Sequence, residues 1–386
     1  MGKALQALDL SQLEDYQLLS KIQQKLTWLP AARSKLVSFN HCCRAALPTA
    51  GRVDVITATD KESQLKRAYY GLVTRCHSGW ICPVCAVRYL TLQANVITSL
   101  IEQKTADGYQ AFMLTLTVPH SQNQSAVEVF RLLKDCKRRM RGTYAYKLQK
   151  KLQIRGSITA TECTYGFYGF HFHQHVLFFM PKEHWSEVEK FETTYKDCWE
   201  RAIGDLIGEP YDELKTNPHS PTKSVYLSRT KTGAPLQISD GNYVCEFGRE
   251  LSKPATMAKR CVRGRSMFEL AASDDPEDFC KFIEYALATK GSARIAFSND
   301  LRRQADELYD AEKKTHDANT ELRVEASFLS QDWAKICEDE IITEQLHRVE
   351  ILRAVLDGGL EAVIAYCAAR GLPCPSEPIF QIKQAG

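Results

Sequence analysis

Three histidines alternate with other residues in the run GFHFHQHVLFFMP, as His171, His173 and His175. Alternate side chains of a β-strand point to the same side, so the three imidazoles are expected to share one face. Imidazole nitrogens in such an arrangement are suitable ligands for a divalent metal ion. The pattern therefore predicts a metal site on a strand. The alternative is a histidine-rich strand whose side chains have only polar partners.

A carboxylate is expected beside these imidazoles. Residues 156–181 predict two strands joined by a turn between Gly166 and Gly169. If the hairpin is symmetric about that turn, Glu162 pairs with His173 and shares its face. Two imidazoles and one carboxylate leave positions open for substrate oxygens, which suits Mg²⁺ or Mn²⁺ together with a phosphate.

A tyrosine at position 243 is a candidate nucleophile for phosphate chemistry. If the run NYVCEFGRELSK forms a helix, Tyr243, Glu246 and Glu250 share one of its faces. A tyrosine hydroxyl can attack a phosphodiester that a metal ion polarises, which leaves a phosphotyrosine and a free 3′-hydroxyl. Since the chain has 16 tyrosines, a buried core tyrosine is the alternative.

A second candidate metal site lies in the run RCHSGWICPVC. Its three cysteines are Cys76, Cys82 and Cys85, whereas most of the chain's 14 cysteines are scattered singly. A C-x-x-C pair with a third sulfur indicates structural zinc in a reducing compartment, and a tetrahedral site needs a fourth ligand. The candidates for the fourth position are Cys42, Cys43, His77 and His41. Because Cys42 and Cys43 are adjacent, only one of them is expected to point inward. Free thiols without a metal are the alternative.

Charge is divided unevenly along the 386 residues. The 50 Lys and Arg against 47 Asp and Glu leave a net charge of +3, which argues against a protein that coats nucleic acid. Residues 131–155, however, hold ten basic side chains against the single acid Asp135, whereas residues 304–350 hold thirteen acids against five bases. Clustered cations attract phosphate backbones. The predicted DNA contacts are Lys137, Arg138, Arg139 and Arg141. A solvated helix face is the alternative.

The composition, 44% hydrophobic and 25% charged, is that of an ordinary soluble globular chain. No run of 18 apolar residues occurs, and the N-terminal run MGKALQALDLSQLEDYQ lacks the apolar centre of a signal peptide. We therefore expect a cytoplasmic protein that contacts no membrane.

The elements that must position these residues alternate between helix and strand. Residues 1–40 have apolar positions at helical spacing, and AFMLTLTV at 111–118 predicts a buried strand. Residues 125–153 predict a basic helical stretch between that strand and the histidine hairpin. Beyond residue 304 the pattern is helical and acidic, and the glycine pair at 358–359 separates two helices.

Several blocks, in their order along the chain, resemble motifs of HUH endonucleases in the form found in replication initiators (Rep proteins) of rolling-circle plasmids. The three motif blocks are TLTVPH at 115–120, TECTYGFYGFHFHQHVLFF at 161–179 and YVCEFGRELSK at 243–253. The cysteine run, GRSMFELA at 264–271 and FIEYALATKGSARIAFSNDLR at 282–302 resemble further blocks of the same proteins. The resemblance covers roughly residues 40–303, and the joint order of the blocks is more specific than any one block.

The resemblance implies roles for individual residues. His173 and His175 match the family's paired metal histidines, and Glu162 matches the acid that completes the metal site in many relatives. His171 matches a residue just before the pair and is either a further ligand or a neighbour. Tyr243 matches the nicking tyrosine, which lies after the histidines in replication initiators and before them in conjugative relaxases.

Two positions depart from the family's pattern. Gln174 replaces the usual apolar residue between the paired histidines, but it is expected to point to the opposite sheet face. Glu246 replaces the lysine usually found three residues after the tyrosine, and our hypothesis is that it activates water to release the covalent intermediate.

The zinc ligands that the resemblance favours are Cys43, Cys76, Cys82 and Cys85.

The fold implied by the resemblance is α+β, an HUH endonuclease core with a central antiparallel sheet flanked by helices. The expected domains are an N-terminal helical segment (1–40), a zinc-binding region (41–105), an HUH nicking domain (106–303) and an acidic helical C-terminal region (304–386). The implied activity is metal-dependent, site-specific nicking of plasmid origin DNA, single-stranded or extruded as a hairpin, with a host helicase and DNA polymerase as partners. The alternatives are an HUH transposase or relaxase, and a non-catalytic zinc protein that binds nucleic acid.

Overall fold

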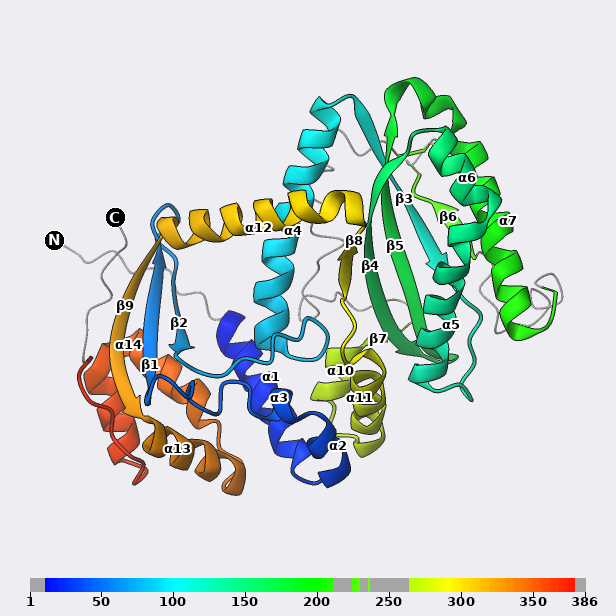
Figure 1. Ribbon diagram of the computed structural model, residues 1–386. Helices are drawn as coiled ribbons and strands as arrows, with labels where there is room; N and C mark the ends of the chain where they lie inside the picture. The colour runs from blue at the N-terminus through cyan, green and yellow to red at the C-terminus, as the bar shows by residue number, and fades with distance from the viewer. Residues whose placement is uncertain (1–10, 211–223, 230–234, 237–263, 379–386) are drawn as a thin grey trace. The chain divides into compact units, whose positions relative to one another are not determined.

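The computed structural model describes residues 11–210, 224–229, 235–236 and 264–378. Figure 1 shows that these residues form helices and antiparallel sheets, an α+β arrangement. The chain divides into two compact units, which are described one at a time. Unit 1 consists of Met1–Val87 with Lys313–Gly386, and unit 2 of Arg88–Glu312. This division differs from the predicted domains, because residues 313–386 share a unit with the N-terminal region.

Unit 1 contains a three-stranded antiparallel sheet in the order β2–β1–β9. Its strands are β1 (Arg52–Asp60), β2 (Lys66–Gly71) and β9 (Thr320–Leu329). The prediction of an entirely helical C-terminal region is wrong at β9. The register joins Arg52 to Leu329, so the partner strand lies more than 250 residues away and no local pattern could indicate the pairing.

The helices of unit 1 include α1 (Ser11–Leu26), α2 (Pro30–Lys35), α3 (Val37–Asn40), α13 (Ser330–Ile342) and α14 (His347–Ala368). A buried aromatic cluster joins α1, β2 and α13. The ring of Tyr70 lies 5.5 Å from that of Tyr16 and 4.5 Å from that of Trp333, measured between centroids. The expected break in the last helix is confirmed, since Gly358 and Gly359 have non-helical backbone angles, and Gly359 has a φ of 65°.

A buried arginine joins three of these helices. The guanidinium of Arg348 on α14 donates hydrogen bonds to the Glu340 carboxylate on α13 and to the side-chain oxygens of Ser20 and Gln23 on α1. The side chains of Arg348 and Glu340 are 2% and 1% exposed. Burial alone would raise the pKa of Glu340, but the charge of Arg348 holds that pKa below its usual range. The pair is therefore ionised inside the core.

Replacing Arg348 with Met is expected to lower the free energy of unfolding by about 3–5 kcal/mol, because it leaves the buried Glu340 carboxylate without its cation. Unfolding by denaturant measures the change. Arg353→Met is the control, since Arg353 pairs with Glu350 at the surface and is 51% exposed. Its effect is expected to stay below about 1 kcal/mol. Equal effects of the two substitutions would contradict the argument.

Unit 2 is built on an antiparallel sheet in the order β6–β3–β5–β4–β7, with β8 also paired to β4. The strands are β3 (Tyr109–Thr117), β4 (Arg155–Gly166), β5 (Gly169–Pro181), β6 (Val225–Leu227), β7 (Arg265–Ser266) and β8 (Ile295–Phe297). The predicted buried strand is confirmed as β3. The predicted hairpin is confirmed as β4 and β5, with Gly166 opposite Gly169 and Glu162 opposite His173.

Helices cover one face of this sheet. The predicted basic stretch forms α5 (Ala126–Arg139), a short 3₁₀ turn (Met140–Gly142) and α6 (Tyr144–Lys151). The other helices are α7 (Val188–Ile207), α10 (Met267–Ala272) and α11 (Pro276–Thr289), and a 3₁₀ turn (Lys182–Glu187) precedes α7. Phe172 and Phe178 of β5 pack against Phe130 of α5 and Phe191 of α7. Even-numbered residues of β5 therefore face the helices, and its odd-numbered histidines face the other side.

Two long helices, α4 (Pro83–Ala106) and α12 (Asn299–Asn319), include residues of both units. Within the described parts of the chain, α4 is the one helix long and apolar enough to cross a membrane by length and composition. Half of its apolar window is buried inside the protein, and core helices pass the same test.

Candidate metal centres

The first candidate centre lies on the neighbouring strands β4 and β5. The Nε2 atoms of His173 and His175 stand 3.4 and 3.9 Å from the same carboxylate oxygen of Glu162. Around an ion with bonds of about 2.1 Å, adjacent ligand atoms lie about 3.0 Å apart and opposite ones about 4.2 Å. The observed separations fall between these limits. One small cation therefore fits among the three side chains, which remain 13–26% exposed.

Neighbouring groups orient these ligands. Thr115 of β3 pairs with His175, and its hydroxyl lies 2.9 Å from the Nδ1 of that histidine, whereas the Nε2 of the same ring faces Glu162. Burial alone would raise the pKa of Glu162, but the hydrogen bond and charge of His173, with the charges of His175 and Arg294, lower it to about 2. The carboxylate is therefore ionised and able to bind a cation.

His171 lies beside this centre and is not part of the three-residue group, whose ligand atoms all lie within 4.8 Å of one another. Its ring is 5.1 Å from that of His173 and 4.8 Å from that of His120, between centroids. Burial, helped by the charges of His173 and His120, lowers the pKa of His171 to about 3. The geometry therefore favours His171 as a neighbour of the candidate metal site and not as a further ligand.

Replacing Thr115 with Val is expected to weaken divalent-metal binding by about 10- to 100-fold, because His175 loses the hydrogen bond that fixes its ring. Isothermal titration calorimetry with Mn²⁺ measures the change in affinity. Thr161→Val is the control, since the Thr161 hydroxyl bonds the side chain of Gln174 on the other face of the sheet. Unchanged metal affinity in Thr115→Val would contradict the assigned role.

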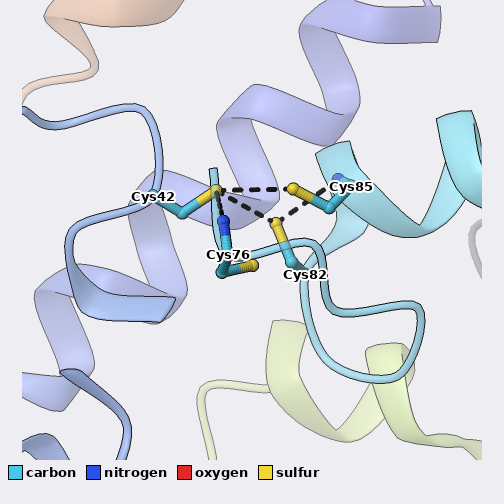
Figure 2. A group of neighbouring side chains, drawn as sticks. All are labelled: Cys42, Cys76, Cys82 and Cys85. Carbon is cyan, nitrogen blue, oxygen red and sulfur yellow. Dashed lines mark hydrogen bonds between the residues drawn. The ribbon is translucent and has the colours of Figure 1, made fainter. Parts of the chain in front are cut away.

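The second candidate centre is a group of four cysteine sulfurs in unit 1, shown in Figure 2. The sulfur of Cys42 lies 3.7 Å from that of Cys82 and 3.6 Å from that of Cys85. In a tetrahedral zinc site with bonds of about 2.3 Å, neighbouring sulfurs lie about 3.8 Å apart. The group that could hold a metal such as zinc is Cys42, Cys76, Cys82 and Cys85.

The surroundings of this group favour a thiolate at Cys85, whereas burial raises the pKa of Cys82 well above its usual range. The backbone N–H groups of Cys76 and Cys85 donate hydrogen bonds to the sulfurs of Cys42 and Cys82, each at 3.4 Å. Cys85 lies in the first turn of α4, where the helix dipole also stabilises negative charge. Hydrogen bonds from Cys42, Cys76 and Cys82 hold the pKa of Cys85 far below its usual range.

The fourth sulfur belongs to Cys42, which corrects the prediction of Cys43. Cys43 has a φ of 60°, in the left-handed region, and its sulfur lies outside the four-cysteine group. That sulfur instead accepts a hydrogen bond of 3.1 Å from the guanidinium of Arg75. The other two candidates, His41 and His77, are exposed and also lie outside the group.

The four basic residues predicted to contact DNA do not gather at the first centre. Arg138 and Arg139 end α5, which covers the sheet face opposite the histidines, and Arg141 follows in the short 3₁₀ turn. Arg138 pairs with Asp135 of its own helix at 3.1 Å, although it remains 73% exposed. The side chains of Arg138, Arg139 and Arg141 therefore face solvent on the helical layer.

Lys137, the fourth of these residues, differs from the other three. Its side chain is half-buried, and its ammonium donates a hydrogen bond to the hydroxyl of Thr159 on β4. Burial, with the nearby charge of Arg141, lowers the pKa of Lys137 to about 8. This lysine therefore joins α5 to the sheet and is not a free surface cation.

Tyr243 and Glu246 lie outside the described residues. The side chains of Glu162, His173 and His175, predicted as metal ligands, lie together in a group that could hold a metal ion. No protein-family model, curated protein or solved structure matches the chain. The case for a function therefore depends on the residues of the chain and on their geometry.

Sequence reasoning gave no individual role to Thr115, which contacts His175, or to His120, which contacts His171. Both lie in the block TLTVPH, which ends the strand next to the histidine strand. Thr115 could have been found from the pairing of β3 with β5, but that pairing joins strands that are distant in the sequence.

Proposed function

We propose that the chain is an HUH-type DNA nickase that initiates rolling-circle replication of a plasmid. The observation that carries the proposal is the group of Glu162, His173 and His175, which leaves space for one cation on two neighbouring strands. The order of the sequence blocks supports it, because the candidate tyrosine at 243 follows the histidines, as in replication initiators. The substrate is origin DNA, single-stranded or extruded as a hairpin.

A divalent ion such as Mg²⁺ or Mn²⁺ would polarise a non-bridging oxygen of the scissile phosphate. The Tyr243 hydroxyl gives up its proton, and its oxygen forms a bond to the phosphorus. The bond from phosphorus to the 3′-oxygen breaks, and that oxygen takes up a proton. The products are a 5′-phosphotyrosine and a 3′-hydroxyl, from which a host polymerase extends as a host helicase opens the duplex.

The four-cysteine group has a structural role in this proposal. Its ligands come from three places in unit 1, the segment after α3, the segment after β2 and the start of α4. A zinc ion bound to all four would cross-link these segments and stabilise a region with few regular elements. Because all four ligands are protein sulfurs, no position is left open for a substrate.

Formation of a covalent protein–DNA adduct tests the proposal. Labelled single strands that tile the replicon carrying the gene are incubated with the protein and Mn²⁺, then separated on denaturing gels. One strand is expected to give an adduct. EDTA and the His173→Ala substitution should each abolish the adduct, whereas the control variant His184→Ala should still form it. Binding without any adduct would favour the non-catalytic zinc protein. Cleavage of transposon ends or of a transfer origin instead would favour a transposase or a relaxase.

Replacing Glu246 with Gln is expected to leave nicking intact and to slow release of the protein from the DNA. The reason is the position of Glu246, three residues after Tyr243, where a carboxylate can activate water. A time course of purified adduct measures the release. The same release rate in the variant and the unsubstituted protein would exclude this role.

A further inference from the structure

The turn between β4 and β5 presents two aromatic side chains to solvent. Phe167 is 75% exposed, the highest value among the large hydrophobic side chains that the structure describes, and Tyr168 is 40% exposed. Their rings pack edge to face, with centroids 5.0 Å apart. They lie at the tip of the same two strands that carry Glu162, His173 and His175.

The backbone holds this turn in place. The side-chain amide of Gln122 donates a hydrogen bond to the carbonyl of Phe167. Gly169 has a φ of 87°, and a Cβ at this position would come within 2.8 Å of the carbonyl of Ser121. The loop after β3 therefore packs directly against the turn and restricts its backbone before any partner arrives, which lowers the cost of binding.

The tip is close to the metal centre. At about 3.3 Å per residue along a strand, Tyr168 lies about 10 Å from His171 and about 17 Å from His173. His120, in the loop after β3, contacts His171 on the intervening surface. The loop and the histidine face therefore form one continuous surface from the turn to the centre.

The chemistry of this surface suits unpaired bases. The loop residues from 121 to 124 are Ser, Gln, Asn and Gln, whose side chains can bond the polar edges of bases. Neither residues 108–127 nor residues 163–182 contain Asp or Glu, so these segments do not repel a polyanion. Exposed aromatic rings stack on bases of any sequence. A protein partner would need a broader apolar patch than two rings flanked by amides.

We propose that Phe167 and Tyr168 form a stacking platform for the unpaired bases of single-stranded DNA that enters the metal centre. The inference rests on the proposed function, because it takes single-stranded DNA as the substrate. It adds a binding site that neither the metal ligands nor the basic residues of α5 provide. The platform holds the strand by its bases while the phosphate backbone continues toward Glu162, His173 and His175.

Binding of fluorescent single-stranded DNA in EDTA tests the platform without nicking. Phe167→Ala and Tyr168→Ala are each expected to weaken binding about tenfold in anisotropy titrations, and the double variant more. Affinity for duplex DNA should stay unchanged, since its bases are already stacked. Tyr144→Ala is the control, because Tyr144 is 64% exposed on α6. Phe167→Trp should retain binding, with its added fluorescence quenched by the DNA.

The outcomes separate this inference from the proposed function. If the chain forms the covalent adduct but the double variant binds single strands as tightly as the unsubstituted protein, the platform is overturned and nicking stands. If no strand of the replicon gives an adduct but the double variant loses affinity, nicking fails and the platform stands. Equal losses of affinity for single-stranded DNA in the double variant and in Tyr144→Ala would also overturn the platform. A double variant that binds single-stranded DNA normally and loses only its binding to another protein would do the same.

Discussion

A Cys42→Ser variant is expected to lose its bound zinc, whereas a Cys43→Ser variant is expected to keep it. The sulfur of Cys42 lies within zinc-site distance of those of Cys82 and Cys85, and the sulfur of Cys43 instead faces Arg75. Structural zinc contributes on the order of 10 kcal/mol to small sites, so losing a ligand should also destabilise unit 1 strongly. Metal analysis and thermal unfolding measure the two effects.

The comparison is well matched, because both cysteines are fully buried and adjacent in the chain. Each substitution exchanges one sulfur for one oxygen at a buried position, so a general packing defect would affect both variants alike. The unsubstituted protein is expected to carry one zinc per chain at this group. Equal zinc loss in both variants would contradict the assignment of Cys42, and unsubstituted protein without zinc would support free thiols.

The grouping of the three side chains at the first candidate centre could be predicted from the sequence because its geometry is local. A turn of two residues between Gly166 and Gly169 fixes the register of the hairpin, and the register alone places Glu162 opposite His173. Strand alternation then puts His175 on the same face. Neither inference needs a contact between residues that are distant in the sequence.

The remaining features depend on information that local patterns do not hold. The choice between Cys42 and Cys43 depends on one backbone angle, the positive φ of Cys43, in a segment without a repeating pattern. The strand character of β9 depends on its pairing with β1. The basic run of α5 indicates charge, but only tertiary packing decides that Lys137 bonds to Thr159 and that the helix covers the face opposite the histidines.

Replacing Tyr243 with Phe is expected to abolish the covalent protein–DNA adduct, a loss of at least about a thousandfold, because the phenyl ring has no oxygen with which to attack the phosphate. Single-stranded DNA should still bind, since the bases and the phosphate backbone are held by other groups. Binding of Mn²⁺ should also persist, because Glu162, His173 and His175 are unchanged. On one preparation, denaturing gels measure the adduct, fluorescence anisotropy measures DNA binding, and metal titration measures Mn²⁺ binding.

Two comparisons make this result decisive among the chain's 16 tyrosines. Tyr165→Phe is the control, because Tyr165 lies on β4, the strand that carries Glu162, and should keep the adduct. His173→Ala should lose both the adduct and the metal, which separates loss of the cation from loss of the nucleophile. If the adduct survives in Tyr243→Phe, mass spectrometry of the DNA-linked peptide would identify the attacking residue. The metal centre would then serve a different tyrosine.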